Sequence, residues 1–168
     1  CDDEVYKVTL TVTDDDGGSD TDTLTVTLAN ADPVADAGPD QSVVEGDIVQ
    51  FNASLTYDPG TCDILTYTWD FGDLNANSTN PNTVSGVNLT HPTHIYTDNG
   101  VYTVTLTVTD DDGGSQSATL TVTVANAAPV AITETIIGGF EGAEVVFTAS
   151  VFDAGANDTH DFEWDFDY

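Results

Sequence analysis

The chain has 168 residues and a formal net charge of −29, because 30 residues are Asp or Glu while Lys7 is the single residue of the Lys and Arg types. Such a charge disfavours nucleic acids and acidic membrane surfaces as partners, and no apolar run approaches the roughly 20 residues of a membrane span. One cation cannot pair thirty carboxylates, so the sequence predicts bound divalent cations, a very salty medium, or both.

A hairpin is the first element expected, over residues 5–28. Apolar residues alternate with Thr on both sides of an acidic turn, so each strand has an apolar face and a row of Thr on the other face. The turn DDDGGS predicts positive φ at Gly17 and Gly18. The apolar face consists of Tyr6, Val8, Leu10, Val12, Leu24, Val26 and Leu28.

Seven short strands are expected next, near 41–45, 47–55, 65–71, 83–90, 93–97, 101–109 and 115–125. Strands this short and this numerous are typical of an all-β, antiparallel sandwich of two sheets. Trp69 occupies the place of the central aromatic residue of immunoglobulin-like sandwiches, so we expect it in the core. The other expected core residues are Val49, Phe51, Ala53, Tyr67, Phe71, Tyr102, Val104, Leu106, Val108, Leu120, Val122 and Val124.

The sequence repeats itself with a period of 96 residues. Residues 5–34 return at 101–130 with 24 of 30 positions identical. Residues 43–54 correspond to 137–150, which places Phe51 over Phe147, and residues 67–73 correspond to 162–168, which places Trp69 over Trp164. A repeat of this length is itself a domain.

Three units follow from this period. Residues 1–30 are expected to be the last two strands of one repeat, residues 31–127 a complete repeat, and residues 128–168 the first three strands of another. The linkers between them are short and contain Pro33 and Pro129. Short joints with proline favour a semi-rigid rod of tandem sandwiches over freely hinged beads.

Three motifs carry a family resemblance: WDFGD at 69–73, YTDNGVYTVTLTVTDDDGGS at 96–115 and SLTYDPGTCDILTYTWDF at 54–71. Together they resemble the PKD repeat, the immunoglobulin-like domain of polycystin ectodomains, archaeal surface-layer proteins and bacterial secreted hydrolases. The resemblance implies an extracellular, non-catalytic module for adhesion, spacing or mechanical linkage. The third copy departs from it, with WDFDY in place of WDFGD and DAGAND in place of DPGTCD.

Acidic loops are expected to gather where the linker enters the complete repeat, because loops of a sandwich cluster at its two ends. Hard oxygen ligands from several loops suit Ca²⁺, which takes 6–8 oxygens, and calcium near this linker end of some PKD-like relatives supports the assignment. The alternative is that these Asp residues only accept hydrogen bonds from turn amides. The expected ligands are Asn30, Asp32, Asp58, Asp63, Asp110, Asp111 and Asp112.

A second calcium site is expected at the next joint, from Asn126, Asp153 and Asp158. Ala128 stands where the first joint has Asp32, so this site is expected to be weaker or to use acidic residues of the complete repeat, namely Asp70, Asp73 and Asp98.

Cys1 and Cys62 are expected to approach the first joint from opposite sides, so a disulfide between them would lock neighbouring repeats. Two free thiols, or a partner of Cys1 upstream, remain as alternatives. Four glycosylation sequons, at Asn52, Asn77, Asn88 and Asn157, agree with a location outside the cell, at the surface or secreted.

Catalysis has no recognisable motif in this sequence. His91, His94 and His160 lack the spacing of a transition-metal site and are expected at the surface. The pair Asp70 and Asp73 offers two carboxylates of the kind that glycosidases use, but no groove is suggested around them.

The favoured function is a non-catalytic segment of a surface layer, stalk, sheath or filament, with joints rigidified by calcium. The alternative is a spacer or binding module of a secreted enzyme that degrades polysaccharide or protein. Expected partners are neighbouring repeats or identical subunits, and cell-surface polysaccharide. Strand complementation between chains would also explain ends that fall within repeats, although a longer chain explains them more simply.

Overall fold

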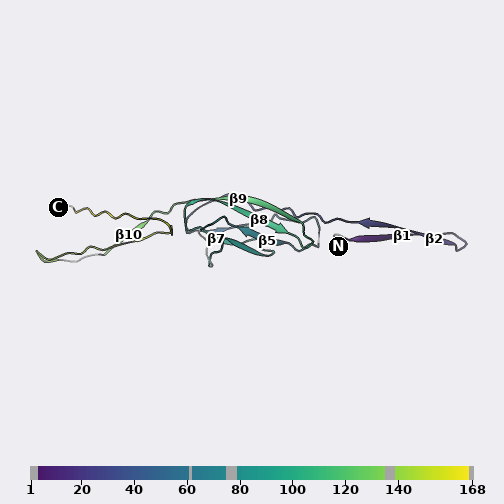
Figure 1. The fold of residues 1–168 in the computed structure, drawn as a ribbon, viewed down its shortest axis with the longest axis horizontal. Coiled ribbons are helices and arrows are strands. Elements are labelled where there is room, and N and C mark those ends of the chain that lie inside the picture. The colour runs from purple at the N-terminus through teal and green to yellow at the C-terminus, as the bar shows by residue number, and fades with distance from the viewer. Residues whose placement is uncertain (1–3, 61, 75–78, 135–138, 167–168) are drawn as a thin grey trace.

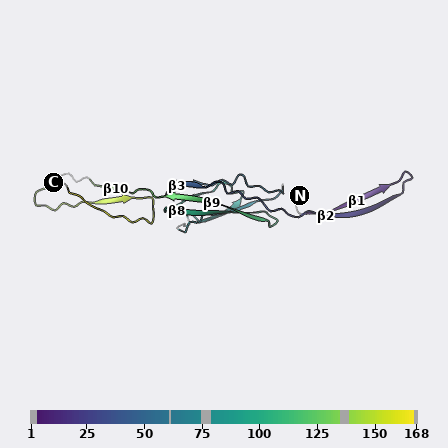
Figure 2. The same ribbon diagram turned by 90° about the horizontal axis from the view of Figure 1, so that it is seen from above.

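The computed structural model describes residues 4–60, 62–74, 79–134 and 139–166 as a rod in which the complete repeat lies between two hairpin-like extensions (Figures 1 and 2). The described residues form strands and no α-helix, and none of them belongs to a helix that could cross a membrane. The strands are β1 (Val5–Thr13), β2 (Ser19–Thr27), β3 (Gln41–Val44), β4 (Ile48–Gln50), β5 (Thr66–Asp70), β6 (Thr83–Val87), β7 (Thr93–Ile95), β8 (Gly100–Thr109), β9 (Ser115–Ala125), β10 (Val130–Thr133) and β11 (Ala149–Phe152).

The complete repeat is a sandwich, as expected. Its larger sheet has the strand order β3-β9-β8-β5-β6, and β4 pairs with β7 in a second, two-stranded sheet. All of these pairs are antiparallel except β3 and β9, which run parallel. Parallel pairing is possible there because most of the repeat connects the two strands, whereas antiparallel neighbours can be joined by a tight hairpin.

The core lies between the two sheets and contains the residues that alternation predicts, except Tyr102, which is partly buried against it. Val104, Leu106 and Val108 of β8 are fully buried, while the Thr residues between them are partly exposed. Trp69 is fully buried and its indole Nε1 donates a hydrogen bond to the carbonyl of Leu89 at 3.0 Å. The central role of Trp69 in the core is therefore confirmed.

The third copy shows the same aromatic packing in a more exposed setting. The ring centroids of Phe147 and Trp164 lie 5.6 Å apart, and those of Phe51 and Trp69 lie 5.5 Å apart. Trp164 is nevertheless 41% exposed. Residues 162–166 lie in no strand, whereas their counterpart β5 pairs with both β6 and β8.

The acidic turns of the two long hairpins differ from the expectation in one respect. Gly17 and its counterpart Gly113 have φ of 91° and 98°, but Gly18 and Gly114 do not have positive φ. A Cβ at residue 18 would lie 2.7 Å from the Asp14 carboxylate, so this glycine makes room for the carboxylate. The prediction of positive φ at Gly18 was wrong.

Candidate metal-binding sites at the ends of the complete repeat

Asp110 joins the β8–β9 turn to the incoming linker. Its Oδ1 accepts hydrogen bonds from the amides of Asp112 at 3.0 Å and Gly114 at 2.7 Å, and its Oδ2 accepts one from the Asn30 side chain at 2.9 Å. The bond from Asn30, followed by the backbone bonds, lowers the pKa of Asp110 against the opposing effect of burial. Asp110 is therefore held as an anion in a site that is only 5% exposed.

Two Asp residues of the loop before β5 meet Asp110. Asp58, Asp63 and Asp110 each offer one oxygen, and these oxygens lie within 4.8 Å of one another. Asp58 Oδ1 accepts the amide of Gly60 at 2.7 Å, whereas its Oδ2 is buried with no hydrogen-bond partner among the described residues. A Cβ on Gly60 would collide with the Asp63 carboxylate, so glycine lets the two carboxylates converge.

The remaining residues expected at this joint lie beside the same group. Asp63, Asp111 and Asp112 form a second set of oxygens within 4.8 Å of one another. A Cβ at Gly114 would lie 2.8 Å from both the Asn30 Nδ2 and the Asp32 Oδ1, which places the linker against the turn. The structure thus brings the seven residues expected at the first joint to one end of the sandwich. An ion bound by three oxygens at 2.3–2.6 Å would fit such spacings.

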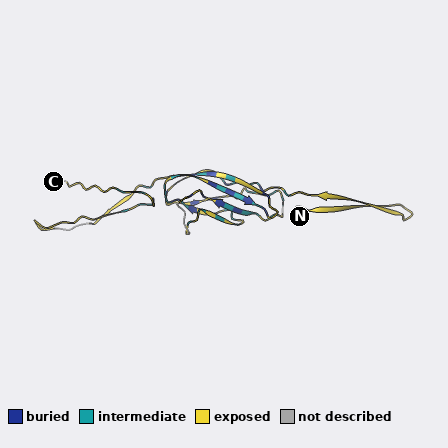
Figure 3. Ribbon diagram, in the orientation of Figure 1, coloured by how far each residue is buried: buried dark blue, intermediate teal, exposed yellow. Residues whose placement is uncertain are grey.

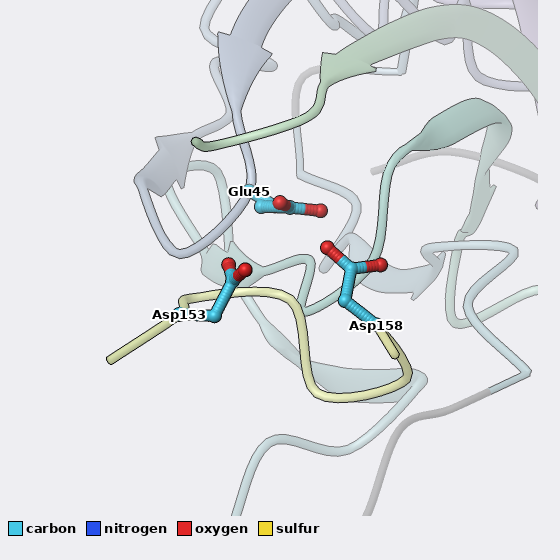
Figure 4. Close-up of side chains that lie close together, drawn as sticks. All are labelled: Glu45, Asp153 and Asp158. Atoms are coloured by element: carbon cyan, nitrogen blue, oxygen red, sulfur yellow. The ribbon is translucent and has the colours of Figure 1, made fainter. Parts of the chain in front are cut away.

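The second joint differs from the expected set by one residue. Asp153 and Asp158 converge with Glu45, which comes from the turn between β3 and β4 of the complete repeat, and their oxygens also lie within 4.8 Å of one another (Figure 4). Asn126 instead donates its side-chain amide to the carbonyl of Ala127. Glu45 was missed, although the Glu-Gly pair at 45–46 returns at 141–142 and could have pointed to it.

Of the expected acidic trio, Asp98 contacts the third copy, since its Oδ2 accepts a hydrogen bond from the Asn157 side-chain amide at 2.9 Å. Asp70 bonds within its own repeat, to the amide of Gly72 and the side chain of Asn82. Asp73 is buried inside the sandwich.

His94 is buried, so its expected surface position was wrong. It is 2% exposed, stacks on Phe71 with ring centroids 4.4 Å apart, and its Nε2 lies 2.9 Å from Asp73 Oδ2. His94 is the middle residue of the three-residue strand β7, between the exposed Thr93 and the half-buried Ile95. Because Asp73 faces His94 in the core, it cannot act with Asp70 as a pair of carboxylates on a substrate.

The pKa of Tyr96 is also shifted in this part of the core. Burial, with a further contribution from the charge of Asp73, raises the pKa of Tyr96, and the Tyr96 hydroxyl donates to the carbonyl of Phe71 at 2.9 Å.

The other two histidines lie nearer the surface. His91 is exposed and bonds Thr90. His160 Nε2 lies 2.8 Å from Asp153 Oδ2, and this hydrogen bond, followed by one from the amide of Gly155, lowers the pKa of Asp153.

Cys62 takes part in a disulfide. Cys1 lies outside the described residues, so its pairing with Cys62 stays a prediction. Asn52, Asn88 and Asn157 are exposed, as an acceptor of a glycan requires. Asn77 also lies outside the described residues.

The sequence profile of the PKD domain family matches residues 30–124, more than half of the chain. Among solved structures, the PKD1 domain of Vibrio anguillarum Epp is 32% identical, with 57% of this chain and 96% of that domain covered and a TM-score of 0.42. A structure of carbohydrate-binding modules from the β-sandwich superfamily is 29% identical, with 64% of this chain and 49% of that one covered and a TM-score of 0.44. A nucleoside hydrolase-related hypothetical protein from Saccharophagus degradans, associated with carbohydrate metabolism, is 19% identical over 58% of this chain and 26% of that one, with a TM-score of 0.42. Through the profile match and the sandwich that carries it, this chain belongs to the PKD domain family.

Proposed function

We propose that this chain is a structural, non-catalytic segment of an extracellular tandem-repeat protein, such as a surface layer, stalk, sheath or filament, and that calcium fastens its first joint. PKD domains are typically non-catalytic modules of extracellular proteins, which supports the first part of the proposal. The rod of repeats in Figure 1 supports a role in spanning distance.

The buried Oδ2 atom of Asp58 is the observation that carries the calcium part. This atom has no donor among the described residues, and the oxygens of Asp63 and Asp110 lie within 4.8 Å of the Asp58 oxygen in this group. A buried polar group left without a hydrogen bond costs about 1–3 kcal/mol, and more when it is charged. A bound cation would remove that cost and the repulsion among the three anions.

An ion bound at this site would also restrain the linker. Asn30 bonds Asp110, and Asp32 lies against Gly114, so a cation held by the loops would also hold the segment that leads into the preceding hairpin. Calcium would thereby reduce bending at the joint, which is what a load-bearing or spacing segment requires.

Thermal melting and small-angle scattering of the full chain, with and without Ca²⁺ at fixed ionic strength, test the proposal. At a free calcium concentration of 100 times the dissociation constant, binding would stabilise the folded state by about 2.7 kcal/mol. We expect a higher melting temperature and a narrower distribution of maximum dimensions with calcium, and a reduced gain in Asp58→Asn.

Potassium chloride at equal ionic strength separates specific binding from screening. A gain that potassium reproduces in full would mean that salt merely screens the charge of −29. Unchanged length and stability on chelation would contradict calcium fastening while leaving the role as a spacer in place.

A further inference from the structure

Glu45 belongs to one repeat, but its carboxylate points at the loop of the next. The β3–β4 turn carries it to the end of the sandwich, where Asp153 and Asp158 of the third copy turn their carboxylates toward it (Figure 4). One oxygen from each of the three lies within 4.8 Å of the other two. From this arrangement we propose that the second joint is a calcium site shared between repeats, with Glu45 as the ligand from the preceding repeat.

Burial of Glu45 is the independent reason to assign a ligand. Glu45 is 3% exposed, its Oε1 accepts the amide of Ala127 at 2.6 Å, and its Oε2 is buried without a hydrogen-bond partner among the described residues. A buried carboxylate is seldom left without a partner. One oxygen of Asp153 and one of Asp158 lie within 4.8 Å of a Glu45 oxygen, so a cation at this place would be shared by three carboxylates.

The third copy holds its two ligands in place through its own loop. Asp153 Oδ1 accepts the amide of Gly155 at 3.1 Å, and its Oδ2 is 2.8 Å from His160 Nε2. Each carboxylate oxygen can accept more than one interaction, so a metal ion can be added to these bonds. A Cβ on Gly155 would collide with the Asp158 carboxylate and lie 3.1 Å from Glu45 Oε1, so this position must be glycine for the three groups to meet.

The two repeats also touch around the proposed ion. The amide of Ala156 donates to the carbonyl of Thr97 at 2.8 Å, and the Asn157 side chain donates to Asp98. Gly46 has φ of 85°, and a Cβ there would lie 3.1 Å from Ala154 Cβ, so the turn after Glu45 is in close contact with the third copy. These contacts hold the turn of Glu45 against the loop of the third copy.

The internal repeat makes the arrangement general along the array. Glu45-Gly46 returns as Glu141-Gly142, with positive φ at both glycines, and the D-x-G-x-x-D loop occurs at 58–63 and again at 153–158. Each repeat therefore contributes a Glu to its joint with the following repeat and a pair of Asp to its joint with the preceding repeat. This inference rests on the proposed function, in which neighbouring repeats are fastened, and adds a second ion with a ligand from the other repeat.

Amide NMR of the ¹⁵N-labelled full chain during titration with calcium chloride resolves the two sites. The amides of Ala127 and Gly155 report on the second joint, and those of Gly60 and Gly114 report on the first. In the natural sequence we expect saturable shifts at both pairs. Glu45→Gln keeps the shape of the side chain and an oxygen for the Ala127 amide, and we expect it to raise the half-saturating calcium concentration at Gly155 about tenfold or more, because affinity follows the number of charged ligands.

Glu141→Gln is the matched control, because it removes the same charge from the corresponding position, which is exposed and outside both sites. It should leave all four reporters unchanged. Asp158→Asn, which removes the ligand on the other side of the joint, should reproduce the loss seen in Glu45→Gln. The same spectra show whether each variant is folded.

If the half-saturating calcium concentration at the Gly155 amide were the same in Glu45→Gln and in Glu141→Gln, the shared site would be overturned. The absence of a saturable shift of this amide in the natural sequence would overturn it as well. Asp58→Asn should abolish saturation at Gly60 while Gly155 still saturates. A failure confined to Gly60 would contradict calcium at the first joint, whereas a failure confined to Gly155 would contradict the shared site.

Discussion

Two hairpins of this chain have nearly the same sequence and very different surroundings. Residues 5–34 and 101–130 are identical at 24 of 30 positions, yet all residues of β1 and β2 are exposed, while buried residues alternate with more exposed ones over residues 104–109 of β8 and 120–125 of β9 (Figure 3). Leu10 is 63% exposed, and its counterpart Leu106 is fully buried. The difference comes from the second sheet and from β5, which cover β8 in the complete repeat and have no counterpart beside β1 among the described residues.

The local structure of the two hairpins is nevertheless the same. The amide of Asp14 donates to the carbonyl of Gly18 at 2.8 Å, and the amide of Asp110 donates to that of Gly114 at 3.1 Å. Both Asp side chains also accept the glycine amide four residues on, at 2.6 and 2.7 Å. Strand pairing and turn shape thus follow from the local sequence, whereas burial follows from partners distant in the sequence.

The largest difference is expected for the two leucines. Leu106→Ala removes a buried side chain and should lower the free energy of unfolding by about 2–5 kcal/mol. Leu10→Ala should change it by less than about 0.5 kcal/mol, because the side chain is mainly in water. Urea unfolding of the full chain, followed by Trp fluorescence, measures both. Similar losses in the two variants would mean that β1 and β2 are covered in solution.

The next difference concerns the Asp that opens each turn. Asp110→Ala removes bonds to two backbone amides and to Asn30 in a buried site, and should cost about 1–3 kcal/mol. Asp14→Ala removes the bonds to the amides of Asp16 and Gly18 at an exposed turn and should cost at most about 1 kcal/mol. Urea unfolding without calcium measures both losses in the free energy of unfolding free of any effect of a bound ion. A loss for Asp110→Ala no larger than that for Asp14→Ala would show that the linker contact contributes nothing.

Replacing the glycine with positive φ should strain the backbone about equally in the two turns. Gly17 and Gly113 have positive φ and no atom within 4 Å of a Cβ, so Ala at either position would meet backbone strain alone, of about 1–2 kcal/mol. Hydrogen exchange of the amides flanking each turn should speed up by a similar factor of about 5–30 in Gly17→Ala and Gly113→Ala. Markedly unequal factors would contradict the claim that the two turns are locally equivalent.

The sequence predicted the fold well because its signals are local. Alternation located the seven strands of the complete repeat and placed Phe51, Trp69 and Leu106 in the core, although β4 ends at Gln50 whereas the expected strand ran to residue 55. It could not place His94, since a short strand such as β7 gives too little alternation to show its face. It also missed Glu45: the recurring Glu-Gly pair marks this position, but the approach of Glu45 to Asp153 and Asp158 depends on how two repeats meet.

The smallest expected effect is the contribution of the single Asp110 carboxyl group to the pH dependence of the free energy of unfolding of the complete repeat. Its pKa is lowered in the folded state from the ordinary 3.8, so its contribution to stability is present above that value and is lost as the pH falls through the lowered folded pKa. Protonation of the other carboxylates acts in the opposite direction, since it relieves the repulsion of a chain with charge −29. The contribution must therefore be taken from the difference between the natural chain and Asp110→Asn, measured without calcium between about pH 5 and pH 2. We expect that difference to shrink as the pH falls below about 4. A difference independent of pH would mean that the bond from Asn30 does not hold Asp110 as an anion, and the linker would then be fixed by the shape of the turn alone.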